Sequence, residues 1–248
     1  MKILGIDIGG SAVKGAPVET TTGQLLAERC RVATPTVLPP AELAAVVGEI
    51  VAHFRWRGRI GIGFPGVVHG PRILTSANLH PDFIGCDGRT LFEQATKRPV
   101  NLVNDADAAG LAEVKFGAGR GRPGTVLLLT LGTGIGSALF CGGALYQNSE
   151  LGHLPWTRGK SAEKFMSGAA RKDLNLDWEE WAGRLSDYLG VLERILWPEL
   201  IIIGGGVSAK HRKYFHFLKT RAKVVPAEFL NEAGIVGAAL WAEGQRGA

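Results

Sequence analysis

Short runs of alternating apolar and polar residues open the chain and predict strands. The alternation predicts strands over residues 2–9, 13–20 and 24–33, with turns at 9–11 and 21–23. Strands that follow one another through short turns pair in an antiparallel meander. We therefore expect the chain to begin as an antiparallel sheet.

Helical and strand patterns then mix. Residues 41–54 have the composition of a helix, whereas 59–63 and 100–104 are apolar runs of strand length on either side of a segment rich in Gly and Pro. Residues 125–130 and 137–141 repeat the opening pattern of strand, glycine turn and strand. These segments predict an α/β protein.

The repeated hairpin predicts two lobes. A third glycine turn, 204–206, follows a strand at 200–203 and precedes a predicted helix from Ser208. We expect a small first lobe over 1–103 and a larger second lobe over 104–232. The final segment, 233–248, is predicted to be helical over 233–244 and to pack back on the first lobe.

Composition limits the class of protein. The 248 residues are 46% hydrophobic, enough for a large core, and no apolar run reaches the roughly 20 residues of a membrane span. The start lacks a signal-peptide pattern, so we expect a cytoplasmic protein without a membrane partner. Cys30, Cys86 and Cys141 are widely spaced and suggest neither disulfides nor a cysteine zinc site. The net charge of +5 suits a polyanionic partner but is also common on ordinary enzymes.

The first glycine turn suits a phosphate. Gly9, Gly10 and Ser11 offer consecutive backbone amides, Lys14 adds a positive charge, and Asp7 precedes the turn. An ordinary hairpin with a glycine turn is the alternative.

The second glycine turn, 131–136, strengthens the phosphate hypothesis. Thr133 adds a hydroxyl donor beside Gly134, and two such turns in matching positions suggest a bound phosphate chain. A dinucleotide site is the alternative, but its fingerprint opens a helix, whereas residues 137–141 continue as a strand. A Walker-type phosphate loop is absent from the sequence.

An acidic motif follows the strand at 100–104. Asp105 stands where a carboxylate can take a proton from a substrate hydroxyl, although it could equally be a helix cap. Asp107 suits the first helical turn, where negative charge is favourable, and is assigned a structural role. Glu150 and His153 suit sugar hydroxyls, while Glu163, at the start of a predicted helix, could be only a first-turn acid.

Five motifs along nearly the whole chain, taken in order, resemble the ROK family of sugar kinases and repressors, and within it the polyphosphate glucokinases. They are Asp7-Ile8-Gly9-Gly10-Ser11, Asn104-Asp105-Ala106-Asp107-Ala108-Ala109-Gly110, Leu131-Gly132-Thr133-Gly134-Ile135-Gly136, Glu150-Leu151-Gly152-His153 and Ile203-Gly204-Gly205-Gly206. The resemblance implies a two-lobed actin-like (ribonuclease H-like) α/β fold with the substrate cleft between the lobes, and, as the family suggests, a homodimer.

The resemblance also implies roles for single residues. It makes Asp105 the catalytic base. It assigns sugar binding to Asn78, Asn104, Glu150, His153 and Glu163. It assigns phosphate binding to Gly9, Gly10, Ser11 and Lys14 at the first turn and to Thr133 and Gly134 at the second. In ATP-using members, Gly205 and Gly206 match the turn that borders the adenosine pocket.

One motif departs from the family. Many ROK proteins bind zinc through one His and three Cys in this region, but residues 154–161 contain no cysteine. We therefore expect His153 to bind sugar without zinc. Polyphosphate glucokinases share the same absence, which narrows the resemblance to that group.

The implied reaction moves a phosphoryl group from polyphosphate, and more weakly ATP, to the 6-hydroxyl of glucose, with mannose as a second sugar. Mg²⁺ would neutralise charge, with Asp7 nearest the metal, directly or through water. The basic residues Lys210, Arg212 and Lys213, or the strip of Arg120 and Arg122, would guide the long donor; a solvated basic helix is the alternative for the first group.

Three rivals differ from this hypothesis. A strictly ATP-dependent hexose or amino-sugar kinase of the same family differs in donor and sugar. A ROK repressor would bind nucleic acid through a helix-turn-helix ahead of the first strand, which we do not expect because that strand begins at Lys2. A sugar sensor without catalysis would not need Asp105.

Overall fold

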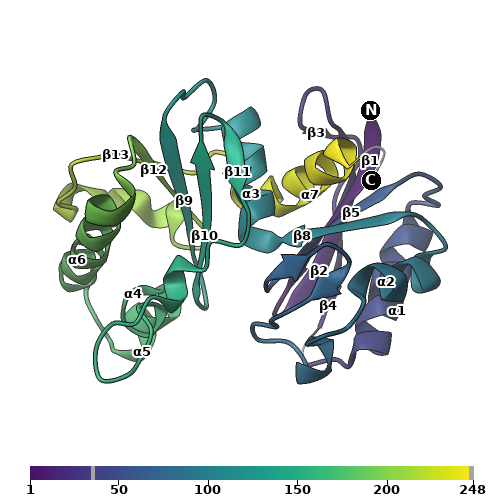
Figure 1. Cartoon of the computed structure of the whole chain (residues 1–248), viewed down its shortest axis with the longest axis horizontal. Coiled ribbons are helices and arrows are strands. Elements are labelled where there is room, and N and C mark those ends of the chain that lie inside the picture. Colours follow the sequence, from purple (N-terminus) through teal and green to yellow (C-terminus); the bar gives the residue numbers. More distant parts are fainter. Residues whose placement is uncertain (35–36, 246–248) are drawn as a thin grey trace. The chain divides into compact units, whose positions relative to one another are not determined.

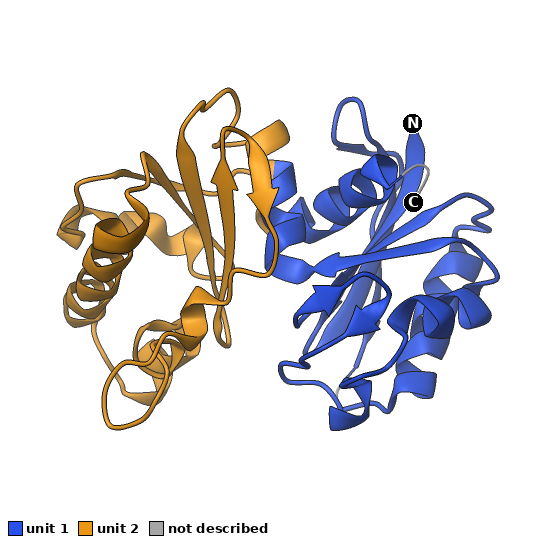
Figure 2. Ribbon diagram, viewed as in Figure 1, with its two compact units in different colours: residues 1–112, 232–248 blue, residues 113–231 orange. Residues whose placement is uncertain are grey.

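The fold is taken from a computed structural model, which describes residues 1–34 and 37–245. The chain divides into two compact units (Figure 2). The first unit contains residues 1–112 and 232–248, and the second contains residues 113–231. Both ends of the chain therefore build the first unit. Residues 246–248 of the predicted C-terminal segment lie outside the described residues.

The first unit is a six-stranded sheet with helices on both faces (Figure 1). Its strands are β1 (Lys2–Gly9), β2 (Ala12–Glu19), β3 (Gln24–Leu25), β4 (Cys30–Ala33), β5 (Ile60–Phe64) and β8 (Val100–Asn104). Its helices are α1 (Pro40–His53), α2 (Gly88–Thr96), the first turns of α3 (Asp105–Lys115) and α7 (Ala233–Gly244). A small ribbon, β6 (Val68–His69) with β7 (Arg72–Ile73), and a 3₁₀ turn at Pro81–Phe83 complete the unit.

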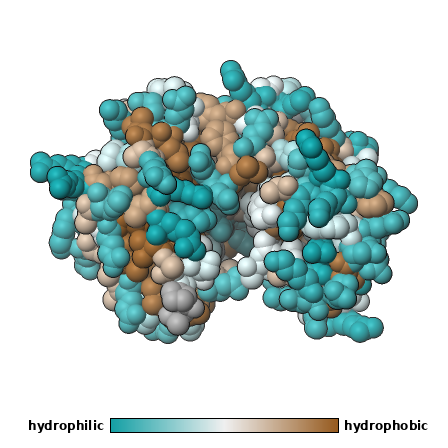
Figure 3. Space-filling model, turned by 180° about the vertical axis from the view of Figure 1, so that it is seen from behind, coloured by the Kyte–Doolittle hydropathy of each residue, from teal (hydrophilic) through white to brown (hydrophobic). Residues whose placement is uncertain are grey.

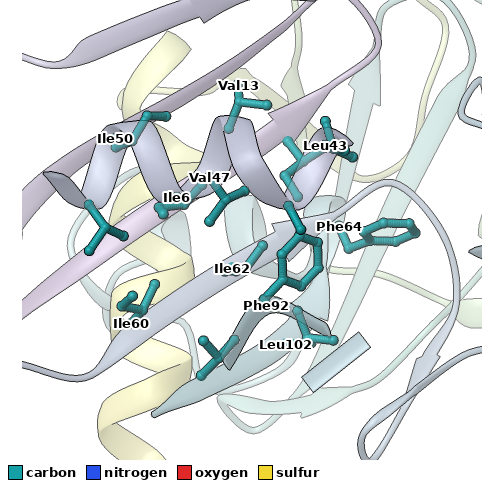
Figure 4. Packing of buried hydrophobic residues seen from close by; sticks show 14 of the residues in the cluster. Ile6, Val13, Leu43, Val47, Ile50, Ile60, Ile62, Phe64, Phe92 and Leu102 are labelled. Carbon is teal, nitrogen blue, oxygen red and sulfur yellow. The ribbon is translucent and has the colours of Figure 1, made fainter. Parts of the chain in front are cut away.

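Side-chain alternation decides which helix covers which face of this sheet. In β5, Ile60 and Ile62 pack with Val47 and Ile50 of α1 in one buried cluster (Figure 4). Gly61 lies between these two isoleucines in the sequence and therefore faces the other side, where a Cβ would collide with the carbonyl of Ala238 in α7. The missing side chain lets the helix backbone rest directly on the strand.

The third predicted strand, 24–33, is wrong as a continuous strand. Two short strands, β3 and β4, pair with opposite ends of β2, and residues 26–29 between them are exposed. Pro17 of β2 lies at the break and has no N–H to donate, so the ladder cannot run through it. The carbonyl of Pro17 instead accepts a single hydrogen bond from Leu26 (2.8 Å).

The second unit is a five-stranded sheet in the order β11-β10-β9-β12-β13. Its strands are β9 (Thr125–Leu131), β10 (Ile135–Cys141), β11 (Ala144–Tyr146), β12 (Leu200–Gly204) and β13 (Lys223–Pro226). Its helices are α4 (Glu163–Met166), α5 (Gly168–Asp173) and α6 (Trp178–Leu196), with 3₁₀ turns at Leu151–His153, Ser208–Lys213 and Phe215–Phe217. A further 3₁₀ turn, Leu230–Glu232, leads back towards α7. Because β9 and β12 are parallel neighbours, the glycine turns that follow them lie at the same edge of the sheet.

Helix α6 is the longest helix and was not predicted from the sequence. Asp177 accepts a hydrogen bond from the backbone of Glu180 (2.8 Å), and the Glu180 side chain accepts one in return (3.2 Å), which forms a capping box. The face of α6 that includes Trp181, Leu185 and Tyr188 is fully buried in the core of the unit.

The prediction of an α-helix from Ser208 is wrong, because the segment forms 3₁₀ turns. The segment forms two 3₁₀ turns with non-helical backbone at Lys210 (φ −108°, ψ 16°). Tyr214 separates the two turns and is fully buried, with its ring stacked on Trp178 and edge-on to Trp181. Burial of this large ring fixes the path of the segment and is incompatible with one regular solvated helix.

A buried carboxylate ties together the two places where the second unit begins and ends. One carboxylate oxygen of Glu113, the first residue of the unit, accepts hydrogen bonds from the amides of Glu228 (2.9 Å) and Phe229 (2.8 Å), and the other accepts one from Ala118 (3.0 Å). The rings of Phe116 and Phe229 lie 6.5 Å apart in the same region. Three amides thus satisfy a charge that is fully buried.

Hydrophilic residues predominate on the face drawn in Figure 3, and hydrophobic residues form smaller patches among them. Among residues 1–34 and 37–245, none of the helices combines the length and the apolar character needed to cross a membrane.

Candidate functional site

In the first unit, a charged pair flanks the first glycine turn. Asp7 of β1 lies opposite Lys14 of β2, and its Oδ2 lies 3.5 Å from the Lys14 ammonium. Burial raises the pKa of Asp7 above its usual value, and the positive charge of Lys14 opposes that effect. The lysine thus helps to keep a half-buried carboxylate ionised.

The start of helix α7 confines Asp7 on its other side. A Cβ on Gly234, the second residue of α7, would lie 2.8 Å from both Cγ and Oδ1 of Asp7. No side chain other than hydrogen fits between this helix and the carboxylate. Sequence reasoning missed Gly234, because nothing in the sequence of this helix distinguishes it from an ordinary small residue.

The first glycine turn is open. Register pairs Gly9 with Ala12, which leaves Gly10 and Ser11 as an exposed two-residue turn. A Cβ on Gly10 would make only an ordinary contact, 3.8 Å from Cβ of Asn78. Neither packing nor a positive φ angle requires glycine at position 10. The absent side chain leaves backbone amides accessible, and Asn78, itself exposed, lies beside them.

The acidic motif begins helix α3, and Asn104 caps that helix. Its Oδ1 accepts hydrogen bonds from the amides of Ala106 (2.9 Å) and Asp107 (3.0 Å), while its Nδ2 donates to the carbonyl of Gly66 (3.1 Å). Asn104 is therefore a buried residue that joins the helix start to the loop containing Gly66. The sequence reasoning did not identify Gly66, which lies in the Gly- and Pro-rich segment after β5.

Asn104, and not Asp105, is therefore the N-cap of helix α3. Asp105 is the first residue of α3, is partly exposed, and one of its carboxylate oxygens accepts a hydrogen bond from the Ala106 amide (2.8 Å). A Cβ on Gly63 would lie 3.6 Å from the Asp105 Cα, so the end of β5 supports the start of the helix. Position at a helix N-terminus favours the negative charge that a base requires. Asp107, by contrast, is fully buried.

In the second unit, the glycine turn between β9 and β10 contains one open and one packed glycine. A Cβ on Gly132 would meet no heavy atom within 4 Å, and Thr133 beside it is exposed. A Cβ on Gly134 would collide with the Glu163 carboxylate. The carbonyl of Gly132 accepts a hydrogen bond from Ala169 at the start of α5 (2.9 Å), which fixes the turn.

Glu163 contacts the glycine turn directly. Its Oε2 accepts a long hydrogen bond from the Ile135 amide (3.4 Å), and its Oε1 lies 3.3 Å from the Lys164 ammonium. Glu163 is the first residue of α4, as expected from the sequence. The structure therefore brings a residue assigned to sugar binding into contact with a turn assigned to phosphate binding.

Glu150 and His153 lie at the two ends of one short turn. The imidazole Nδ1 of His153 lies 3.6 Å from Oε2 of Glu150. Burial raises the pKa of Glu150, the charge of Glu163 raises it further, and His153 acts in the opposite direction. The three predicted sugar ligands of this unit thus influence one another electrostatically.

The third glycine turn follows β12. Gly205 has a positive φ of 76°, and a Cβ there would lie 2.7 Å from the backbone of Leu131, so only glycine fits. Gly206 is exposed, and a Cβ on it would meet nothing within 4 Å. Since Gly204 pairs with Thr130, this turn is a direct neighbour of the glycine turn after β9.

The two groups of basic residues lie in different places. Lys210, Arg212 and Lys213 are exposed and follow the third glycine turn, at the carboxyl edge of the sheet. No carboxylate within the described ranges 1–34 and 37–245 pairs with any of the three. Arg120 and Arg122 are also exposed, but they precede β9 and so lie towards the opposite edge.

The donors that could hold a metal are few. Within the described residues, no group of three or more His, Cys, Asp or Glu side chains has the spacing of a metal site. Mg²⁺ differs from most metals in needing only one or two carboxylates when phosphates supply the remaining ligands. Asp7, a single partly buried carboxylate beside an open glycine turn, fits that pattern.

Comparison with known proteins gives consistent results. A sequence profile of the ROK family matches residues 3–168. The chain is 43% identical over 237 residues to the polyphosphate glucokinase of Mycobacterium tuberculosis (strain CDC 1551 / Oshkosh), covering 95% of this chain and 89% of that protein.

Solved structures of ROK proteins have the same fold. The inorganic polyphosphate/ATP-glucomannokinase of Arthrobacter sp. strain KM superposes with a TM-score of 0.94 at 42% identity, covering 99% of both chains. A ROK glucokinase of Streptomyces griseus, solved with glucose and AMPPNP, gives 0.84 at 25% identity over 98% of this chain and 100% of that one. The predicted actin-like α/β fold is confirmed. The family model and these relatives together show that this chain belongs to the ROK family.

Proposed function

We propose that this chain is a glucokinase that transfers a phosphoryl group from inorganic polyphosphate to the 6-hydroxyl of glucose. Asp105 accepts the proton of that hydroxyl as the phosphoryl group arrives. The observation that carries this assignment is the cap of helix α3. Because Asn104 supplies the cap, the Asp105 carboxylate is not the N-cap of the helix, and it lies at a partly exposed position at the helix N-terminus.

The remaining hydroxyls of glucose bind to Glu150, His153 and Glu163, with Asn78 as a further contact. The first three gather around one edge of the second unit, and their mixture of acceptors and a ring N–H suits hydroxyls that both donate and accept. Asn104 is a further sugar contact, and its Oδ1 also caps the helix that begins with Asp105.

The glycine turns and Mg²⁺ bind the donor. Gly9, Gly10, Ser11 and Lys14 form one phosphate site, and Thr133 with Gly134 forms a second. When bound, Mg²⁺ neutralises charge on the transferred phosphoryl group, and Asp7 is the carboxylate that would hold it. In the ATP-dependent side activity, Gly205 and Gly206 border the nucleotide.

The preference for polyphosphate rests on two observations. The relatives with about 40% identity over nearly the whole chain carry polyphosphate in their names. The exposed cations Lys210, Arg212 and Lys213 follow the third glycine turn at the same edge of the sheet, where a long polyanion would pass. A strictly ATP-dependent hexose kinase is the alternative, favoured by the complex of the Streptomyces griseus enzyme with AMPPNP.

A matrix of kinase assays tests the function. Purified protein is assayed with glucose and mannose, each against polyphosphate and ATP in the presence of Mg²⁺. The proposal expects glucose with polyphosphate to give the highest kcat/KM. Turnover with ATP alone would contradict the donor assignment, and no sugar phosphorylation with either donor would contradict the function itself.

Asp105→Asn tests the base. The amide keeps the shape of the side chain but cannot take a proton, so kcat should fall by about 10³-fold or more while the Kd for glucose stays within about twofold. Retained turnover in this variant would remove Asp105 from the base role.

Two multiple variants test whether the basic residues after the third glycine turn bind polyphosphate. Replacing Lys210, Arg212 and Lys213 by Ala should raise the KM for polyphosphate about tenfold at low salt and leave the KM for glucose unchanged. The double variant Arg120→Ala and Arg122→Ala, at the opposite edge, is the control. A larger effect in the control would move the donor path to the Arg120 and Arg122 strip.

The proposal extends to the location, the oligomeric state and the sugar range of the protein. We propose a cytoplasmic homodimer that also accepts mannose, as the glucomannokinase relative does by name. Light scattering of the purified protein tests the dimer, and the mannose arm of the assay matrix tests the sugar range.

A further inference from the structure

Two of the proposed sugar ligands, His153 and Glu163, are joined by a small hairpin, residues 154–162. Leu154 accepts a hydrogen bond from the amide of Ala162 (2.9 Å), and Lys160 accepts one from the amide of Trp156 (2.9 Å). Pro155 and Ser161 pair between them as an antiparallel bridge. The 154–162 hairpin therefore determines how far apart the two ligands lie.

The base of the 154–162 hairpin is packed and its tip is not: Ala162 is fully buried, and Leu154 and Trp156 pack against the core of the second unit. Its tip, residues 157–160, is exposed and polar, and Arg158 and Gly159 turn the chain with φ angles of 54° and 69°. A short isolated hairpin is only marginally stable in water. A further contact at the base, beyond those of Leu154 and Ala162, restrains the hairpin.

Trp156 supplies that contact. Its ring lies edge-on to the ring of Tyr188 in α6, with centroids 6.1 Å apart and planes at 73°. Tyr188 is fully buried in the core of the second unit, so it is a rigid base for the indole. A cavity of about 170 Å³ lies beside Trp156 and is lined by Phe165, Met166, Arg184 and Asp187.

Tyr188 also lies near Glu163. Burial raises the pKa of the Tyr188 hydroxyl strongly, and the negative charge of Glu163 adds to the effect. Within the described residues, the Tyr188 hydroxyl has no hydrogen-bond partner. Glu163 in turn contacts Gly134. Trp156 thus contacts Tyr188, the charge of Glu163 acts on the Tyr188 hydroxyl, and Glu163 contacts the second glycine turn.

We propose that Trp156 is a positioning residue for the sugar: its packing on Tyr188 anchors the 154–162 hairpin and fixes His153 relative to Glu163. The inference rests on the proposed glucokinase function. An aromatic side chain gives this segment part of its attachment to the core. The anchor is apolar and needs no metal to form.

Three variants test the inference: Trp156→Ala, Trp156→Phe and Tyr188→Phe, with Trp197→Ala as a control. Trp197 lies in the same unit, is 67% exposed and stacks with Arg221. Calorimetry with glucose, without donor, measures sugar binding, and steady-state kinetics measures the KM for polyphosphate. Circular dichroism establishes that each variant is folded.

Trp156→Ala should weaken glucose binding about tenfold and leave the KM for polyphosphate within about twofold, because a misplacement of about 1 Å is enough for such a loss. Trp156→Phe, which retains an aromatic ring on Tyr188, should recover most of the affinity, and Tyr188→Phe and Trp197→Ala should bind glucose as the unmodified chain does. If Trp156 only stabilised the fold, Trp156→Ala would lower the melting temperature, and the glucose affinity and the KM for polyphosphate would change to the same extent.

Two results would overturn the inference. One is glucose binding by a folded Trp156→Ala variant that matches the unmodified chain. The other is an equal loss for glucose and polyphosphate. Failure of the unmodified chain itself to bind glucose would instead overturn the proposed sugar site, and with it this role of Trp156.

Discussion

The two glycine hairpins look alike in sequence but differ in what holds them. The turn between β1 and β2 is open at Gly10 and is flanked by the Asp7 and Lys14 pair. The turn between β9 and β10 is open at Gly132 but packed at Gly134 against the Glu163 carboxylate. The same local motif therefore lies beside a charged pair in the first unit and against a single carboxylate in the second.

Among changes that distinguish the two hairpins, the largest expected effect comes from removing the negative charge at the first hairpin. Asp7→Asn keeps the shape of the side chain and removes the negative charge, which should lower kcat by about 100-fold, since removal of one electrostatic group from an active site commonly costs that much. Steady-state kinetics with polyphosphate measures it. Glu19→Gln, at the far end of the same hairpin, is the control and should keep full activity. A fully active Asp7→Asn variant would contradict the proposed role of this hairpin in catalysis.

The next effect separates the two glycines of the second hairpin. Gly134→Ala forces the Glu163 carboxylate to move and should raise the KM for glucose about tenfold. Gly132→Ala meets no protein atom and should leave the KM for glucose unchanged while raising that for the donor. If both variants change the same constant, the link between Glu163 and the turn has no functional role.

A smaller effect compares the helix caps beside the two hairpins. Asn104→Ala removes the cap of α3 and should lower the free energy of unfolding by about 1 kcal/mol or more, because the Gly66 carbonyl also loses its donor. Ser167→Ala removes the hydrogen bond to Ala170 that caps the short helix α5 and should cost less. Urea unfolding measures both. A greater cost for Ser167→Ala would reverse this order.

The smallest effect is a pH dependence in the second unit. The raised pKa of Glu150 means that its ionised form is less stable in the folded chain than in the unfolded one. Stability is therefore reduced above the raised pKa and recovers as the pH falls from there to the usual glutamate value. Glu150→Gln should be slightly more stable than the unmodified chain at pH 7, and the difference should vanish at pH 4. Thermal unfolding at both pH values measures it, and a difference that grows on acidification would contradict the assignment.

The periodic and glycine-rich parts of the fold could be predicted from the sequence. The strands at Lys2–Gly9 and Val100–Asn104 and the helix Ala233–Gly244 have the predicted bounds, because each is a short apolar run closed by a turn or cap residue. Helix α6 was missed although Asp177 and Glu180 carry its capping-box signature. The strand break at Pro17 and the 3₁₀ path imposed by burial of Tyr214 depend on tertiary partners that no local pattern contains.

The candidate site shows the same division. Asp105 could be proposed from its motif, but only the structure shows that Asn104 takes the capping role. The contacts of Asp7 with Gly234, of Glu163 with Gly134 and of Trp156 with Tyr188 join residues distant in sequence or opposite in a turn. Such contacts follow from how helices and turns pack on the sheets, so the sequence provides the residues but not their pairing.

The hydrogen bonds of the Glu113 carboxylate bring the two ends of the second unit together. These bonds hold residue 113 beside residues 228 and 229, so the second unit begins and ends at one place on its own surface. Segments whose ends meet can be inserted into a host chain with little disturbance. Residues 113–231 therefore have the architecture of a continuous segment inserted into a discontinuous host, with helix α3 crossing the point of insertion.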